Sequence, residues 1–192
     1  MDHQEVLDIL LEGNRRYAEG CLVHPHLTKA RRRGTVEGQR PFAAILGCAD
    51  SRVPPELIFD MGIGDLFVIR VAGNIVDQTV TASIEYAAGH LGVPLVLVLG
   101  HSCCGAITAA LTGAVTGGHL PCLAAALEPS LAPIDRNSPD AVARAAVAHA
   151  GRMAKKLREC SPMLSCLIGR GTLRVASAHY DLATGLVSIL DD

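Results

Sequence analysis

The sequence of 192 residues contains no tryptophan, and aromatic residues make up only 3% of it. Its charge is small as well, with a formal net charge of −2 at pH 7. The one basic run, residues 29–33, is short and has no aromatic neighbours. A solvent-exposed face or a subunit contact therefore explains this run better than nucleic-acid binding, and no nucleic-acid partner is expected.

Long hydrophobic segments are missing too. The longest apolar stretch, residues 93–99, is too short to cross a bilayer and is typical of a buried strand. The chain begins with Met1, Asp2 and His3, without the apolar core of a signal peptide. Seven cysteines, an odd number without a secretory signal, favour a reducing compartment over a disulfide framework. We therefore expect a cytoplasmic protein with no membrane partner.

Hydrophobic residues make up 49% of the chain and charged residues 19%, so a substantial core can form. Continuous apolar runs alternate with segments of helical spacing. The runs are residues 42–46, 65–71 and 95–99, and the helical segments are residues 79–91 and 104–111. Continuous hydrophobicity marks strands that are buried on both faces, so we predict an α/β fold with a central, mainly parallel sheet flanked by helices. No repeat or linker divides the chain, and a single domain over residues 1–192 is expected.

Both ends of the chain add further elements. Residues 1–20 predict an amphipathic helix, followed by a loop rich in His, Pro and Arg. An alanine-rich segment that runs to Leu157 predicts a late helix, with Ser138 as its cap and a proline in its first turn. Residues 173–190 contain two apolar runs around a turn and predict a hairpin-like strand pair.

Two of the apolar runs end in residues that bind soft metal ions. Cys48 follows the first run, and His101 and Cys104 follow the third. Ligands gather outside the carboxyl ends of the strands in an open parallel sheet, so these side chains are expected at one edge. A His-x-x-Cys pair alone is usually a buried thiol beside a hydrogen-bonded histidine, but a second cysteine at another strand end favours zinc. By position alone Cys103 is as good a candidate as Cys104, since a thiolate at either residue starts the same helix.

Asp50 and Arg52 indicate what kind of metal site this is. A structural zinc site needs four protein ligands. Arg52 stands close enough to Asp50 for a bidentate pair, which would hold the carboxylate off the metal, keep it ionised and leave a position for water. A carboxylate held beside a metal-bound water suits hydrolytic chemistry. Without the nearby cysteine, a helix-cap aspartate beside a surface arginine would be the default interpretation.

These motifs, together with others along the chain, resemble those of the β-carbonic anhydrases. The similarity covers nearly the whole sequence, and the combination of Cys-x-Asp-x-Arg with His-x-x-Cys is highly specific. The matching stretches are residues 11–16 (LEGNRR), 48–56 (CADSRVPPE), 64–70 (GDLFVIR), 72–74 (AGN), 83–86 (SIEY), 100–106 (GHSCCGA) and 180–185 (YDLATG).

The resemblance implies one Zn²⁺ per subunit, bound by Cys48, His101 and Cys104. Asp50 and Arg52 would form the catalytic dyad, and in a closed state Asp50 would become a fourth ligand. The implied reaction is the reversible hydration of carbon dioxide to bicarbonate and a proton. The chain would form a dimer or tetramer, with the N-terminal helix packing on a partner subunit. The residues implied in substrate binding, partly across the subunit interface, are Gln39, Phe67, Ala72, Tyr86 and Gly105.

Two other functions fit the same motifs. Hydrolysis of carbonyl sulfide or carbon disulfide occurs on scaffolds that resemble this one, and pocket shape rather than ligand identity separates those enzymes from hydratases. A non-catalytic zinc-binding module would use Asp50 as a permanent fourth ligand, and an intact Asp50–Arg52 pair argues against it. Assays of the three substrates side by side would separate the two enzymes.

Overall fold

A five-stranded sheet in the order β2-β1-β3-β4-β5 forms the centre of the computed structural model, which describes residues 1–190. The strands are β1 (Ala43–Cys48), β2 (Leu66–Val71), β3 (Leu95–His101), β4 (Arg174–Tyr180) and β5 (Val187–Leu190). The first four are parallel, and β5 pairs antiparallel with β4. The predicted parallel sheet and C-terminal strand pair are therefore confirmed. The single domain over residues 1–192 stays a prediction, and its last two residues lie outside the described part.

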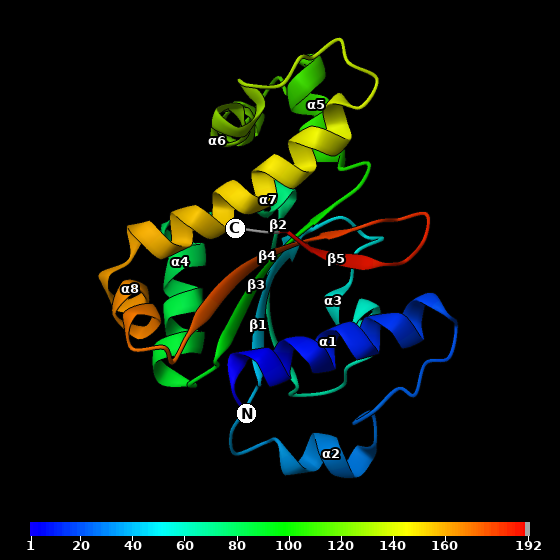
Figure 1. The fold of residues 1–192 in the computed structure, drawn as a ribbon, viewed down its shortest axis with the longest axis vertical. Helices are drawn as coiled ribbons and strands as arrows, with labels where there is room; N and C mark the ends of the chain where they lie inside the picture. The colour runs from blue at the N-terminus through cyan, green and yellow to red at the C-terminus, as the bar shows by residue number, and fades with distance from the viewer. Residues whose placement is uncertain (191–192) are drawn as a thin grey trace.

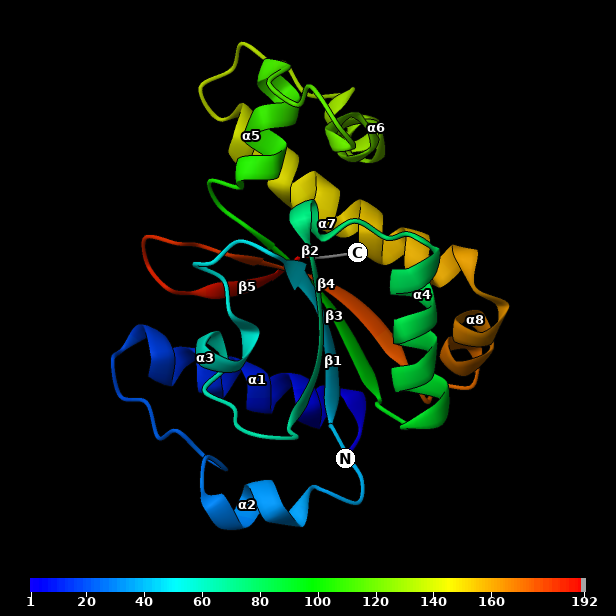
Figure 2. The same ribbon diagram turned by 180° about the vertical axis from the view of Figure 1, so that it is seen from behind.

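Helices cover both faces of this sheet (Figures 1 and 2). One face carries α1 (His3–Ala18) and α3 (Pro55–Ile58), and the other carries α4 (Gln78–Glu85), α7 (Ala141–Cys160) and α8 (Pro162–Gly169). The remaining elements are α2 (Lys29–Gly34), α5 (Gly105–Thr112), α6 (Leu120–Leu131) and two short turns, η1 (Ala72–Asn74) and η2 (Tyr86–His90). Across residues 1–190, no helix has the length and hydrophobicity needed to span a membrane.

Alternating side chains along the central strands build the two layers of the core. In β3, the residues that face α1 and α3 are Leu95, Leu97 and Leu99, and those that face the opposite layer are Val96 and Val98. All five are fully buried, as the continuous apolar run predicts. By contrast, β2 is only half-buried along its whole length because it forms one edge of the sheet.

The N-terminal helix packs against the chain's own sheet. It begins after Asp2, whose carboxylate accepts hydrogen bonds from N–H groups of the first turn. Its apolar stripe, which includes Val6 and Leu10, is buried against the layer formed by β1, β3 and β4. The amphipathic helix is confirmed, whereas its contact with a partner subunit stays a prediction.

Three local features differ from what the sequence predicts. Helix α2 lies within the expected loop, and the side chain of Thr28 caps it by accepting from the N–H of Arg31. Helices α6 and α8 were not predicted, although Ser161 caps α8 in the way expected of Ser138. Ser138 is not the cap of α7, because that helix begins only after Asp140 and the Ser138 hydroxyl donates to the Asp140 carboxylate.

Candidate metal centre

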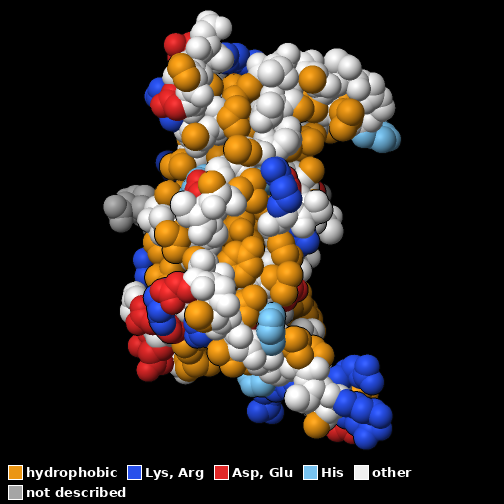
Figure 3. All heavy atoms as spheres, turned by 90° about the vertical axis from the view of Figure 1, so that its right-hand side faces the viewer, with side chains coloured by type: hydrophobic (Ala, Val, Ile, Leu, Met, Phe, Trp, Pro, Cys, Tyr) orange, Lys and Arg blue, Asp and Glu red, His pale blue; other side chains and the backbone are white. Residues whose placement is uncertain are grey.

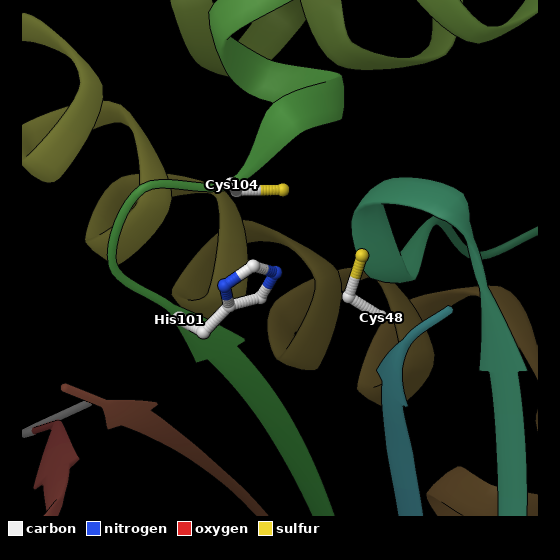
Figure 4. Close-up of side chains that lie close together, drawn as sticks. All are labelled: Cys48, His101 and Cys104. Carbon is white, nitrogen blue, oxygen red and sulfur yellow. The ribbon is translucent and has the colours of Figure 1, made fainter. Parts of the chain in front are cut away.

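Three side chains meet at the carboxyl end of the sheet (Figure 4). Cys48 ends β1, His101 ends the adjacent parallel strand β3, and Cys104 precedes the first residue of α5. One donor atom from each residue lies within 4.8 Å of the other two, and all three residues are buried. The strand ends thus bring together the three residues that the sequence predicts as ligands.

This donor set fits zinc. The Nδ1–H of His101 donates to the carbonyl oxygen of Ser102 at 2.9 Å, which fixes the tautomer and leaves the lone pair of Nε2 free. That Nε2 atom is buried and has no hydrogen-bond partner among the described residues. A buried nitrogen without a partner costs free energy, and a metal ion removes that cost. Two cysteine thiols and one imidazole at this spacing are the ligands that zinc prefers.

The two thiols of the cluster influence each other. The nearby thiol of Cys104 lowers the pKa of Cys48. The N–H of Gly73 donates to Cys48 Sγ, at 3.3 Å. The same contact between the two thiols, together with burial, raises the pKa of Cys104. The pair therefore releases one proton easily and the second only when a cation balances the charge.

Cys103 lies outside this cluster and is exposed. Its backbone adopts φ 53°, a left-handed conformation that turns the chain between His101 and α5. Its carbonyl oxygen accepts a hydrogen bond from Arg52 Nη2 at 3.1 Å. The geometry therefore joins Cys104, and not Cys103, to the other two donors.

Asp50 and Arg52 form a bidentate ion pair beside the cluster. Arg52 Nε and Nη2 donate to the two carboxylate oxygens of Asp50 at 2.9 and 2.8 Å. Arg52 thereby holds the pKa of Asp50 well below its usual range. Asp50 Oδ2 lies 4.0 Å from His101 Nε2, so the carboxylate borders the donor cluster without belonging to it.

Two supporting residues of this site were not assigned a role from the sequence. Arg70 donates from Nε to the carbonyl oxygen of Cys48 at 2.9 Å and from Nη2 to that of Asp50 at 2.5 Å. The hydroxyl oxygen of Ser102 accepts from the N–H of Leu182 at 2.8 Å, which ties the loop after β3 to the turn after β4. These partners lie 20 or more residues away along the chain, so no local spacing could reveal them.

Two of the residues implied in substrate binding lie next to the candidate ligands. Ala72 follows the last residue of β2, and that residue is in register with Cys48. Gly105 follows Cys104 as the first residue of α5, and no side chain caps that helix. Both residues are exposed, so they can border a substrate at the cluster.

The other three lie at the opposite end of the strands. Phe67 is in register with Ala44, four residues before Cys48 and about 13 Å away at 3.3 Å per residue. Its ring contacts that of Tyr86, with centroids 6.0 Å apart. Gln39 is exposed and precedes β1. Within one chain, the structure does not bring these three side chains to the cluster.

Comparisons with known proteins identify the family of the chain. The family model described as carbonic anhydrase matches residues 43–187. Carbonic anhydrase 2 of Mycobacterium tuberculosis is 39% identical over 186 residues, which are 95% of this chain and 90% of that protein.

Solved structures show the same likeness. The β-carbonic anhydrase CcaA has a TM-score of 0.76 at 28% identity, covering 97% of this chain and 88% of that one. A tetrameric β-carbonic anhydrase of Sordaria macrospora has a TM-score of 0.75 at 29% identity, covering 98% of both chains. The chain therefore belongs to the carbonic anhydrase family, in its β class.

Proposed function

We propose that this protein hydrates carbon dioxide reversibly to bicarbonate and a proton, with Cys48, His101 and Cys104 as its zinc ligands. The observation that carries the proposal is the Asp50–Arg52 pair, because Arg52 engages both carboxylate oxygens beside the donor cluster. Three protein donors leave a position for water or substrate, whereas a closed site of four does not. Family membership supports carbon dioxide as the substrate.

Zinc, when bound, supplies a water whose pKa falls from about 16 to roughly neutral. The carboxylate of Asp50, which borders the donor cluster, would accept a hydrogen bond from such a water and orient it toward the substrate. Arg52 keeps that carboxylate ionised, and its contact with the Cys103 carbonyl fixes the dyad to the loop between His101 and Cys104. The N–H of Gly105, in the uncapped first turn of α5, is available to donate to the anionic product.

We further infer that a second subunit completes each site as part of a dimer or tetramer. Gln39, Phe67 and Tyr86, which the family resemblance implicates in substrate binding, lie away from the cluster of their own chain. Figure 3 shows apolar side chains gathered in a broad band over one side of the molecule, a surface of the kind that subunit contacts cover. The relative from Sordaria macrospora is tetrameric.

The odd number of cysteines supports a cytoplasmic location.

Zinc content measured together with stopped-flow hydration of carbon dioxide across pH tests this function. We expect one zinc ion per subunit and turnover of carbon dioxide that exceeds turnover of carbonyl sulfide and carbon disulfide in parallel assays. A zinc-loaded protein without turnover at any pH would instead be a binding module. Turnover confined to the sulfur compounds would make the protein a hydrolase.

A further inference from the structure

A buried histidine outside the proposed ligand set connects two helices to one of the candidate ligands. His149 on α7 is 0% exposed. Its ring contacts the carbonyl oxygen of Gly73 through Nε2 at 2.7 Å and the hydroxyl of Ser130, on α6, through Nδ1 at 2.9 Å. The N–H of the same Gly73 donates to Cys48 Sγ at 3.3 Å. One residue of the turn after β2 thus joins the histidine to the thiol.

The direction of the two hydrogen bonds made by the His149 ring follows from the atoms involved. A carbonyl oxygen only accepts, so Nε2 of His149 carries the hydrogen and donates to Gly73. Nδ1 therefore accepts from the hydroxyl of Ser130. Burial lowers the pKa of His149, which keeps the ring in this neutral form.

The turn that bears Gly73 needs support from its surroundings. Gly73 has φ 66° and the next residue, Asn74, has φ 39°, so two successive residues are left-handed and one of them is not glycine. Such conformations cost free energy and persist only where neighbouring groups hold them. A Cβ atom on Gly73 would lie 3.2 Å from Leu127 of α6, so a larger residue would press against that helix.

Helix α7 supplies further support along one of its faces. Met153 Sδ accepts the N–H of Val76 at 3.3 Å, and Lys156 Nζ donates to the Val76 carbonyl at 2.7 Å. These residues follow His149 by four and seven positions and lie on the same side of the helix. Of the three contacts, the one from His149 reaches the residue whose N–H meets Cys48.

We propose that His149 is a positioning residue for the zinc site, holding the turn at residues 72–74 so that the Gly73 N–H donates to the Cys48 thiolate. The inference rests on the proposed ligand role of Cys48. Groups that hydrogen-bond to metal ligands set the orientation and basicity of those ligands, and their loss typically weakens metal binding about 10-fold to 100-fold. His149 acts one residue further out, through the backbone of Gly73.

Four single variants test this role. His149→Leu removes the donor, whereas His149→Gln can place an amide N–H at the position of Nε2. Ser130→Ala removes the hydroxyl that orients the ring. Ser161→Ala is the matched control, because Ser161 is also a buried hydroxyl, bonded to Glu85 at 2.5 Å, and the described contacts do not link it to the cluster.

The measurements are zinc affinity by competition with a chelator, the thiolate-to-cobalt absorption band of the Co²⁺-substituted protein, and thermal unfolding. We expect His149→Leu to bind zinc about 10-fold to 100-fold more weakly and to shift the cobalt band. His149→Gln should restore both properties to near the wild-type values. Ser161→Ala should lower thermal stability without changing either property.

Zinc affinity and a cobalt band in His149→Leu equal to those of Ser161→Ala would overturn the proposal. If His149→Leu does not fold, the two serine variants decide, and equal affinities in them would overturn it as well. A different result would contradict the proposed function itself: zinc affinity that is unchanged in Cys48→Ser.

Discussion

The two ends of the central strands differ in what they need in order to form a site. At the carboxyl end, Cys48, His101 and Cys104 come from one chain and already lie within 4.8 Å of one another. At the amino end, Phe67 and Tyr86 contact each other but no donor cluster. Metal ligands need placement to within about 0.5 Å, which two adjacent strand ends and the start of α5 provide here, whereas contacts to a small apolar substrate can come from a neighbouring subunit.

Burial distinguishes the two ends in the same way. The three candidate ligands are between 1% and 4% exposed, while Tyr86 is 46% exposed. The residues at the carboxyl end are thus buried by folding of one chain, whereas Tyr86 at the amino end remains exposed in it. A single chain thus brings together the three candidate ligands but, on our proposal, only part of the active site.

The largest expected effect distinguishes two adjacent cysteines at the carboxyl end of the strands. Cys104→Ser should release zinc and lower hydration by at least about 10³-fold, because the metal supplies the nucleophile. Cys103→Ser should retain both zinc and activity, since Cys103 lies outside the cluster. Metal analysis with stopped-flow hydration checks both variants. Zinc loss from Cys103→Ser with retention in Cys104→Ser would reverse the ligand assignment.

A smaller loss of activity is expected when Asp50 is replaced and the three candidate zinc ligands are unchanged. Asp50→Asn should keep zinc but slow hydration by about 10²-fold to 10⁴-fold, the range of a positioned acid–base group. The amide has nearly the same shape as the carboxylate but lacks its charge. Normal turnover in this variant, measured at equal zinc content, would remove Asp50 from the mechanism.

Substitutions at the amino end of the strands should reduce activity less than Asp50→Asn does and should leave zinc bound. Gln39→Ala should lower kcat/KM by about 10-fold to 100-fold, the worth of a hydrogen bond to a charged or developing anion. Arg40→Ala, at the neighbouring exposed position, is the matched control and should behave like the wild type. If the two variants have the same kcat/KM, Gln39 has no role in substrate binding.

The smallest effect concerns pH and stability. Burial lowers the pKa of His149 and of His179 below the ordinary value of 6.5. As the pH falls, these histidines are therefore protonated in the unfolded chain before they are protonated in the folded chain. Their contribution to the free energy of unfolding is complete above about pH 6.5 and declines below it, by at most about 1.4 kcal/mol per pH unit for each histidine. Urea unfolding of zinc-saturated His149→Gln between pH 7.5 and 5 should show a shallower decline than the wild type, and equal slopes would contradict this.

Much of the sheet and of the metal centre is predictable because both depend on short stretches of sequence. A continuous apolar run that ends in Cys48 or His101 specifies both a buried strand and a residue at its carboxyl end. The separation of Asp50 and Arg52 by one residue likewise suffices to predict their ion pair. Cys103 and Cys104 could not be separated in this way without the family resemblance, because the φ of 53° at Cys103 decides between them.

Other features depend on contacts between distant parts of the chain. Helix α6 contains Pro129 and weak apolar spacing, which hides it from a search for helical patterns. His149 stands on the buried stripe of α7 like an isolated core histidine, and only the approach of Gly73, 76 residues away, gives it a role. The contact between α1 and a partner, the closed state of Asp50 and the cytoplasmic location stay predictions.

Mixing two impaired variants tests the division between the two ends of the strands most directly. One variant is Asp50→Asn, and the other combines Gln39→Ala with Tyr86→Ala. In a two-fold symmetric dimer, each mixed dimer would hold one complete site, built from the intact dyad of one chain and the intact contacts of the other. We predict that dissociation and reassembly of an equal mixture restores about a quarter of the wild-type activity per subunit, since half of the dimers are mixed and half of their sites are complete. Activity that stays at the average of the two separate variants would contradict the shared site.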